Sequence, residues 1–267
     1  MRNREAPERF GPYQLIRPLA SCALAERWLA LHEDDESSHV IYRFGPYRDK
    51  NERRRFVQAA ESVARLRHPH LMPIEQYSLD HSEWGWIVTP YTGNSENLVH
   101  LGQVLESKGG TMGAVEMDRC VRQLLEAYSY AHQKRRYHGP VTMHDVLVDT
   151  RGSLWIELFG MRRYLEGLAD GDAELVRDAI RSVIEIAYTL LTGLPADEPR
   201  ISASRLVRRL GKAWDVWFET GLDPHAGFAS ADAALAALPT SEREDEPAPV
   251  VRTVLGRIRS SMGAKSG

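Results

Sequence analysis

Cysteine, net charge and long apolar runs are all scarce in this chain. Its 267 residues include only two cysteines, Cys22 and Cys120, which form no CxxC pair, so the sequence favours a reducing compartment and argues against a structural metal. A net charge of −3 supplies no global field that would attract nucleic acid or an anionic membrane. Because no window approaches about 18 consecutive apolar residues, we expect a cytoplasmic protein with no membrane span and no signal peptide.

The motifs of several common enzyme classes are missing as well. The sequence contains no Gly-x-Ser-x-Gly elbow, HExxH helix or Walker loop, which removes the usual signatures of hydrolases and nucleotide switches. Ten histidines raise the question of a metal site. However, His68 and His70 flank Pro69 after a helical pattern, and His132 completes an apolar helical face. We therefore expect no metal site.

Two regions with different secondary-structure patterns follow one another along the chain. Strand patterns rich in β-branched and aromatic residues dominate residues 11–92, interrupted by one helix. Helical patterns dominate residues 93–239, and the most apolar of them ends at Gly193. The sequence thus predicts an α+β fold with a small β-rich lobe and a larger helical lobe, preceded by an extension over residues 1–10.

The last segment, residues 240–267, has a composition of its own. An acidic, proline-bearing stretch, TSEREDEPAP, leads into VVRTVLGRIRSSMG, where apolar residues at helical spacing are interspersed with arginines. The side chains that one helical face would carry include Val250, Val254, Leu255 and Ile258. The segment is either a contact surface for a protein partner or an unstructured end. A further alternative is that its basic residues fold back on the acidic stretch.

Several local strings occur in an order that is typical of one family. LRHPHLMPI, AYSYAH, YTLLTG and GLDPHAGFASADAALAAL follow one another along the chain. They resemble the helix-to-strand corner of the small lobe, the run into the catalytic loop, the end of the central helix and the final helices of protein kinases. Residues 11–239 are therefore similar to the protein kinase family, most of all to its bacterial serine/threonine branch. The resemblance implies two lobes, residues 11–92 and 93–239, around a nucleotide cleft.

The resemblance also implies positions for the residues that hold the nucleotide, and these positions are changed here. In place of the glycine-rich loop that approaches the phosphates, LASCALAE has Ala20, Cys22 and Ala25, whose Cβ atoms crowd that approach. The strand lysine becomes Arg43, whose planar fork has a different donor geometry. The helix glutamate that pairs with this lysine in the family falls at Ala59.

The stretch HGPVTMHD lies over the HRDxKxxN catalytic loop of the family. By this resemblance Pro140 replaces the catalytic Asp, Thr142 the Lys and Asp145 the Asn. The string LFG puts Leu158 where the magnesium-binding Asp belongs. Proline has no carboxylate to orient a substrate hydroxyl, and leucine has no oxygen for a cation. Since phosphoryl transfer depends on positioning and on metal charge, the resemblance implies that this chemistry has been lost.

The adenine pocket that the resemblance implies is altered in two walls. Ile41 replaces an alanine and Arg27 replaces a valine, so one wall is bulkier and the other carries charge. We expect adenine to fit poorly. The remaining positions of the implied pocket are Thr89, Thr92 and Leu147.

Three acidic residues flank the implied metal site. Asp145 is the best candidate for a substitute ligand. Asp149 begins the turn DTRG, where aspartate commonly bonds the local backbone. Glu157 alternates with Ile156 and Leu158, so we expect its side chain to face away from the cleft. We therefore expect Asp149 and Glu157 to be structural or solvated.

The regions that dock peptide substrates in the family are shortened. The segment between Gly160 and the central helix is short and has no APE string, and Gly227 stands where the family has the arginine that pairs with that glutamate. Residues 192–214 are compressed as well, so we expect the helix that docks peptides to be short or missing.

Side chains that join the lobes in the family are retained. By the resemblance Val63, His138 and Phe159 occupy its internal spine. A retained spine without the catalytic acids indicates a pseudokinase, with no cofactor, that binds proteins as a scaffold or allosteric regulator in signalling. The alternative is an atypical phosphotransferase, or a nucleotide sensor, that binds ATP with magnesium through Arg43 and Asp145.

Overall fold

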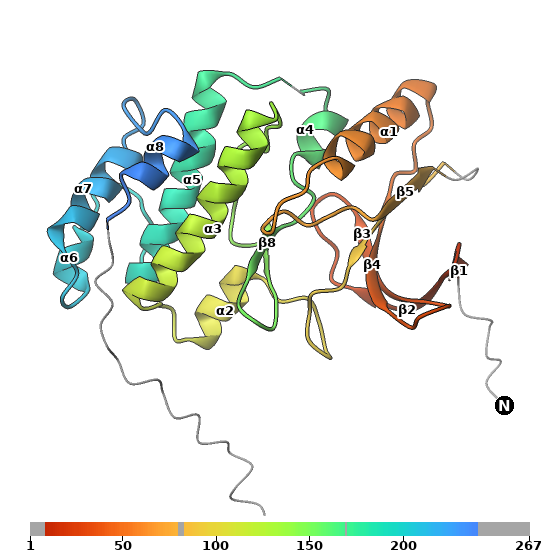
Figure 1. Ribbon diagram of the computed structural model, residues 1–267, viewed down its shortest axis with the longest axis horizontal. Helices are drawn as coiled ribbons and strands as arrows, with labels where there is room; N and C mark the ends of the chain where they lie inside the picture. The colour runs from red at the N-terminus through yellow and green to blue at the C-terminus, as the bar shows by residue number, and fades with distance from the viewer. Residues whose placement is uncertain (1–8, 80–82, 169, 240–267) are drawn as a thin grey trace, which may run out of the picture.

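The computed structural model describes residues 9–79, 83–168 and 170–239, which form two lobes side by side (Figure 1). The elements of the smaller lobe are β1 (Arg9–Phe10), β2 (Tyr13–Leu19), β3 (Glu26–His32), β4 (Ser38–Phe44), α1 (Lys50–Ala64), β5 (Gln76–Leu79) and β6 (Gly85–Pro90). Those of the larger lobe are α2 (Leu101–Ser107), α3 (Ala114–Gln133), β7 (Val146–Val148), β8 (Leu154–Ile156), α4 (Met161–Leu165), α5 (Ala173–Thr192), α6 (Ala203–Leu206), α7 (Lys212–Gly221) and α8 (Ala231–Ala236). The predicted α+β fold class is confirmed.

A six-stranded antiparallel sheet with the order β1-β2-β3-β4-β6-β5 forms the wall of the smaller lobe. Side chains alternate across each strand, so β4 sends Val40, Tyr42 and Phe44 to the face that packs against α1. We call this the inner face. Ile41 and Val88 lie in a separate apolar cluster on the opposite, outer face. Both faces are apolar, which explains why the β4 sequence shows no clean alternation of apolar and polar residues.

Helix α1 owes its start and its orientation to a few residues. The Asp49 carboxylate accepts hydrogen bonds from the backbone N–H groups of Asn51 and Glu52, which closes a capping box. Such a cap stabilises a helix by about 0.5–2 kcal/mol. The helix presents Phe56 and Ala59 to the sheet, and both side chains are fully buried. The helix is therefore fixed on the inner face of the sheet.

Helices α3 and α5 run through the centre of the larger lobe (Figure 1). The C-terminal half of α5 is buried on most of its sides, as its apolar sequence predicts. The helix ends at Gly193, which has a φ of 72°. A Cβ atom at this position would lie 2.9 Å from the carbonyl oxygen of Gly110. Both the left-handed backbone and the close approach therefore favour the glycine that the sequence marked as the stop.

The chain between α5 and α7 contains little regular structure. After Gly193 it forms the four-residue helix α6 and otherwise irregular backbone before α7 begins at Lys212. The helix that forms here, α6, is therefore short, as expected from the sequence. Within the described ranges, no helix has both the length and the apolar character needed to cross a bilayer.

Candidate functional site

A buried ion pair joins the two lobes and includes Arg27, one of the positions of the pocket that the resemblance implies. Arg27 of β3 reaches from the inner face of the sheet, and its Nη1 lies 2.8 Å from Oε1 of Glu157, which follows β8. The exposed fractions of the two side chains are 3% and 5%. The Nε of Arg27 also donates a hydrogen bond of 2.5 Å to the carbonyl of Ala20. The guanidinium is thus held by both lobes and by the loop before β3.

The same carboxylate oxygen accepts a second strong hydrogen bond. Tyr42 of β4 pairs directly with Arg27 in the sheet, and its hydroxyl donates to Oε1 of Glu157 over 2.6 Å. Burial, and next the negative charge of Glu157, raise the pKa of Tyr42 well above its ordinary value, so the phenol remains a donor. Tyr42, Arg27 and Glu157 therefore form one buried polar cluster, which we call the interlobe triad.

The charges of the interlobe triad support one another. Burial alone would lower the pKa of the Arg27 guanidinium, but the adjacent Glu157 carboxylate and Tyr42 raise it above its ordinary value. The guanidinium therefore stays charged. A buried pair of this kind adds little net stability over apolar side chains, but removing one partner typically costs about 3–5 kcal/mol. The triad makes the lobes depend on each other.

Our expectation that Glu157 faces away from the cleft is wrong. Strand β8 ends at Ile156, and the Glu157 N–H instead donates 2.9 Å to the carbonyl of Asp145. The next residue, Leu158, has a φ of 45°, in the left-handed region. The two-residue alternation of a strand therefore stops before Glu157, and its side chain turns toward the sheet.

The expected positions of Arg43 and Ile41 in the cleft are also wrong. Ile41 lies on the outer face of the sheet. Arg43 lies on the outer side too, where its Nε donates 2.9 Å to Glu26 and its guanidinium lies 4.6 Å from the Trp84 ring centroid. Because a shift of one residue moves a side chain to the other face, the cleft positions belong to their neighbours Val40 and Tyr42. Sequence reasoning missed Tyr42, because both faces of β4 are apolar and the local sequence does not favour one register over the other.

The loop that replaces the glycine-rich loop folds down toward the inner face. Ala25 is buried in the same cluster as Leu19, and Cys22 packs against this cluster, whereas Ala20 is exposed. The Cys22 N–H donates 3.1 Å to the Ala25 carbonyl. Burial, and next the Glu157 charge, raise the pKa of the Cys22 thiol. The loop thus presents apolar side chains to the cleft.

Helix α4 covers Ala59, the position at which the family has its helix glutamate. Ala59 of α1 is fully buried, and Met161 of α4 is buried in the same cluster, where α4 packs against α1. The nearby Glu61 is half-exposed and pairs with Arg65 one turn later. No carboxylate of α1 therefore reaches the interlobe triad.

The catalytic-loop positions hold a turn rather than a metal site. Pro140 and Thr142 are exposed. The Asp145 carboxylate accepts a 2.8 Å hydrogen bond from the Thr142 N–H and a 2.7 Å bond from its hydroxyl. Leu158 is buried among apolar side chains. No group of three or more His, Cys, Asp and Glu side chains in the described ranges is arranged to bind a metal.

The expectation that Asp149 is structural is confirmed. Its Oδ1 accepts hydrogen bonds of 2.8 Å from the backbone N–H groups of Arg151 and Ser153. The carboxylate thereby closes the turn between β7 and β8, as the DTRG string predicts.

The spine residues are packed, but they belong to two clusters. Phe159 is buried in the core of the larger lobe, with its ring centroid 5.1 Å from that of His138. The His138 Nδ1 accepts a 2.9 Å hydrogen bond from the Gly160 N–H, and burial lowers the His138 pKa to about 4. Val63 is buried in the cluster of the smaller lobe, which also takes in Leu158. Apolar packing therefore joins the lobes around the interlobe triad.

The other implied pocket positions surround the triad in different ways. Thr89 is buried and pairs with Val40 across the sheet, so it faces the same side. Leu147 of β7 is fully buried in the cluster of the inner face. Thr92 is half-buried, and its hydroxyl has no hydrogen-bond partner within the described part of the chain.

Two lobes around such a cleft define a protein kinase-like domain, and comparison with known sequences agrees. The family model described as "Protein tyrosine and serine/threonine kinase" matches residues 19–179. The chain therefore belongs to the protein kinase family.

Among its relatives are two bacterial enzymes. Serine/threonine-protein kinase PrkC of Bacillus subtilis is 27% identical over 154 residues, which make up 57% of this chain and 23% of PrkC. Serine/threonine-protein kinase PknI of Mycobacterium tuberculosis is 25% identical over 149 residues, or 54% of this chain and 24% of PknI. The match thus spans about a quarter of the length of these relatives.

The comparison with solved structures supports the same fold. The crystal structure of the Mycobacterium tuberculosis PknI kinase domain aligns with a TM-score of 0.66 at 22% sequence identity. The alignment covers 88% of this chain and 99% of that domain, so it extends over both lobes.

Proposed function

We propose that this chain is a pseudokinase: a catalytically inactive member of the protein kinase family that binds other proteins as a cytoplasmic scaffold or allosteric regulator in signalling. The observation that carries the proposal is the interlobe triad. Arg27, Tyr42 and Glu157 place a buried ion pair and a phenol between the lobes, where a nucleotide would have to enter. A nucleotide would have to separate these charges before it could bind.

The chemistry of the neighbouring positions supports the absence of catalysis. Magnesium prefers hard oxygen ligands, whereas Leu158 offers none and the Glu157 carboxylate already holds Arg27 and Tyr42. Pro140 has no group that accepts a proton from a substrate hydroxyl. Phosphoryl transfer rests almost wholly on such positioning and charge stabilisation, so each of these changes acts against it.

The binding role follows from what the domain retains. Both lobes are packed, and the triad and the apolar cluster hold them together with side chains alone. Such a domain offers a rigid surface without requiring a nucleotide to order it. The alternative of an atypical phosphotransferase loses support, because the Arg43 that it required lies on the outer side of the sheet.

A thermal-shift experiment tests the nucleotide part of the proposal. A ligand at 100 times its dissociation constant stabilises a protein by about 2.7 kcal/mol, which raises the melting temperature of a domain of this size by roughly 5–10 °C. We expect no such shift with ATP, with or without Mg²⁺ or Mn²⁺. A shift of this size in the wild type would contradict the proposal and favour a nucleotide sensor.

Two double variants show whether the triad is what excludes the nucleotide. Arg27→Val/Glu157→Thr removes both charges of the buried pair. Arg65→Val/Glu61→Thr removes an exposed pair on α1 and serves as the matched control. A shift with ATP that occurs only in the first variant supports the triad as the cause. If ATP changes the melting temperature of neither variant, as in the wild type, then residues other than the triad exclude the nucleotide.

The binding part needs a separate measurement. The full chain is crosslinked to neighbouring proteins in the cells that express it, and the crosslinked proteins are isolated and identified. Each of these proteins is then titrated against the purified chain without ATP. The proposal expects at least one direct complex that forms without nucleotide. If none of the recovered proteins binds directly, the scaffold role is wrong.

A further inference from the structure

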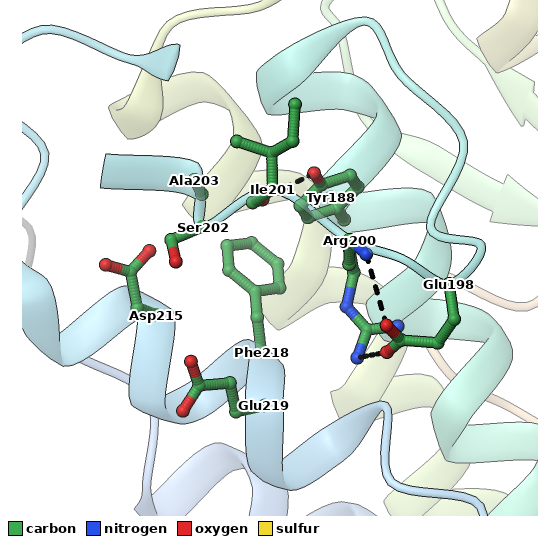
Figure 2. Close-up of a pocket in the computed structure, with 9 residues that line it drawn as sticks. All are labelled: Tyr188, Glu198, Arg200, Ile201, Ser202, Ala203, Asp215, Phe218 and Glu219. Atoms are coloured by element: carbon green, nitrogen blue, oxygen red, sulfur yellow. Dashed lines mark hydrogen bonds and ion pairs between the residues drawn. The ribbon is translucent and has the colours of Figure 1, made fainter. Parts of the chain in front are cut away.

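The far end of the larger lobe carries a hollow that the interlobe site does not use. It has a volume of about 170 Å³ and lies between the end of α5, the irregular segment that leads to α6, and α7. Figure 2 shows Phe218 at its centre, with Ile201 on one side and Glu219 on the other. Arg200 lines the hollow as well, and its guanidinium pairs with Glu198 over 2.6 Å.

Three large apolar side chains are exposed on the segment and the two helices that border this hollow, and one of them, Ile201, lines it. The exposed fractions of Ile201, Leu206 and Val216 are 46%, 42% and 61%. Val216 and Glu219 are three residues apart on α7 and therefore lie on the same side of that helix. Helix α6, which carries Leu206, packs against α7. Apolar side chains that gather on one surface in this way commonly mark a contact site.

The charges on this surface fall into two groups. Next to the hollow, Glu219 has no hydrogen-bond or ion-pair partner among the residues that the structure describes. Exposed basic side chains lie on and between the two helices: Arg205 of α6, Arg208 of the connection and Lys212 at the start of α7, none of which has a carboxylate partner within the same described ranges. An acidic group therefore lies beside the apolar side chains, and a basic group lies along the connection. We call the whole surface, residues 198–219, the α6–α7 face.

The end of this chain has the complementary pattern. Residues 242–246, EREDE, contain four acidic side chains, and the following VVRTVLGRIR combines apolar residues with Arg252, Arg257 and Arg259. These residues lie outside the part that the structure describes, and so do the expected contacts of Val250, Val254, Leu255 and Ile258. In sequence, an acidic stretch comes first and a basic, apolar stretch follows.

The described chain ends close enough to α7 for the following segment to reach that helix. Helix α8 packs against α7, where the Trp217 Nε1 donates 3.0 Å to the carbonyl of Ala234. From residue 239, the chain to residue 250 spans at most about 36–40 Å when extended. Helix α7 has ten residues, so it is about 15 Å long. The connection is therefore long enough to place the apolar stretch anywhere along α7.

We propose that residues 242–259 dock onto the α6–α7 face of their own chain. The acidic stretch lies against the basic group of the connection, and the apolar side chains cover Ile201, Leu206 and Val216. The arginines face Glu219 and the other acidic side chains at the hollow. This inference does not depend on whether the chain transfers phosphate.

Photo-crosslinking in the full chain identifies the occupant directly. A benzophenone amino acid replaces Val216 in one protein and Val115 in a control, since Val115 of α3 is also exposed, with a fraction of 53%. After irradiation, the crosslinked peptides are mapped by mass spectrometry. We expect position 216 to crosslink to residues 250–259 within a single chain, independently of protein concentration, and position 115 not to do so.

Substitutions in the full chain test the contacts that the proposal names. Val254→Asp/Leu255→Asp should abolish the crosslink from position 216. Glu219→Lys should lower its yield by about 1.4- to fivefold, because one exposed charge pair contributes about 0.2–1 kcal/mol. Raising the salt from about 50 to about 500 mM should lower the yield as well.

Four outcomes would overturn the proposal. The first is equal crosslinking of the tail from positions 216 and 115. The second is a crosslink between two chains that grows with concentration, which would assign the face to a second copy. The third is a crosslink yield that Val254→Asp/Leu255→Asp leaves unchanged. The fourth is the absence of any tail crosslink from position 216 in the wild type.

Discussion

The hydroxyl of Tyr42 and the Oε1 of Glu157 lie 2.6 Å apart, although 115 residues separate them in sequence. The contact joins the sheet of one lobe to the segment after β8 of the other. Arg27 reaches the same oxygen from the neighbouring strand. The two lobes are therefore joined by a polar contact that is buried inside the protein.

Removing one partner of the interlobe triad should destabilise the protein strongly. Glu157→Ala leaves the Arg27 charge buried without a partner, and we expect it to lower the free energy of unfolding by about 3–5 kcal/mol. The double variant Arg27→Met/Glu157→Leu should recover most of this loss, since it buries no charge. Urea unfolding of the three proteins measures these differences.

The exposed pair on α1 provides the control for this cycle. Glu61→Ala breaks the contact with Arg65, which lies at the surface, and should change stability by less than about 1 kcal/mol. If Glu157→Ala is as mild as Glu61→Ala, then the pair is hydrated in solution and the interlobe triad is not a buried ion pair.

A comparison of adjacent residues in β4 tests the register of the strand. Tyr42→Phe removes a buried hydrogen bond to a charged oxygen and should cost about 1.5–3 kcal/mol. Arg43→Ala removes a partly exposed pair with Glu26 and a contact with Trp84, which together should cost about 1 kcal/mol. Chemical denaturation gives both values. A larger loss for Arg43→Ala would mean that Arg43, not Tyr42, faces the cleft.

The fold was more predictable from the sequence than the site. Strings such as LRHPHLMPI and the stop at Gly193 depend on local periodicity and backbone preference. In the structure α1 ends at Ala64, just before LRHPHLMPI begins, and α5 ends at Thr192, just before Gly193. The register of β4 could not be predicted in this way. Val40, Ile41 and Tyr42 are all fully or almost fully buried, because both faces of the sheet are covered. Local sequence then gives no means of choosing between two registers that differ by one residue.

The interlobe triad was beyond sequence reasoning for a second reason. Arg27 and Glu157 are 130 positions apart, and either alone resembles an exposed charge in a short strand. The turn of the Glu157 side chain depends on the end of β8 at Ile156 and on the left-handed backbone of Leu158. Both are consequences of tertiary packing, since leucine has no local preference for that conformation.

The stability of the domain should fall as the solution becomes acidic. Burial lowers the His132 pKa from its ordinary 6.5 to about 4 in the folded protein. Between about pH 6.5 and pH 4, the unfolded chain therefore binds a proton at His132 that the folded chain does not bind. The free energy of unfolding that this difference contributes is fully present above about pH 6.5 and is lost as the pH falls toward 4. We expect the urea midpoint to be lower at about pH 5 than at about pH 7.

A substitution of His132 shows how much of the pH dependence of stability comes from this histidine and how much from other groups. His132→Phe keeps a ring against Tyr128 and Tyr137 but cannot bind a proton, so it should flatten part of the slope. His138 should account for more of it, because burial lowers its pKa to about 4 as well. His225→Phe changes an exposed residue and should leave the slope as it is. An unchanged slope in His132→Phe would show that His132 titrates normally in the folded protein.

Restoring the two missing acids of the family should not restore phosphoryl transfer. In Pro140→Asp/Leu158→Asp, the second new carboxylate would enter an apolar cluster next to the Glu157 charge, since Leu158 is only 3% exposed. Burial and a like charge both raise the pKa of such a carboxyl group, so it would tend to be neutral and a poor metal ligand. Removing a general base alone typically costs about 10²–10⁴ in rate, and the phosphate loop and the helix glutamate are changed here as well.

Incubation with radiolabelled ATP, Mg²⁺ or Mn²⁺ and a generic protein substrate measures transfer, with an active serine/threonine kinase and a heat-killed sample assayed in parallel. Transfer above the heat-killed sample in the wild type, removed by EDTA, would reject the pseudokinase proposal; transfer in the double variant alone would show that the interlobe triad does not keep nucleotide out.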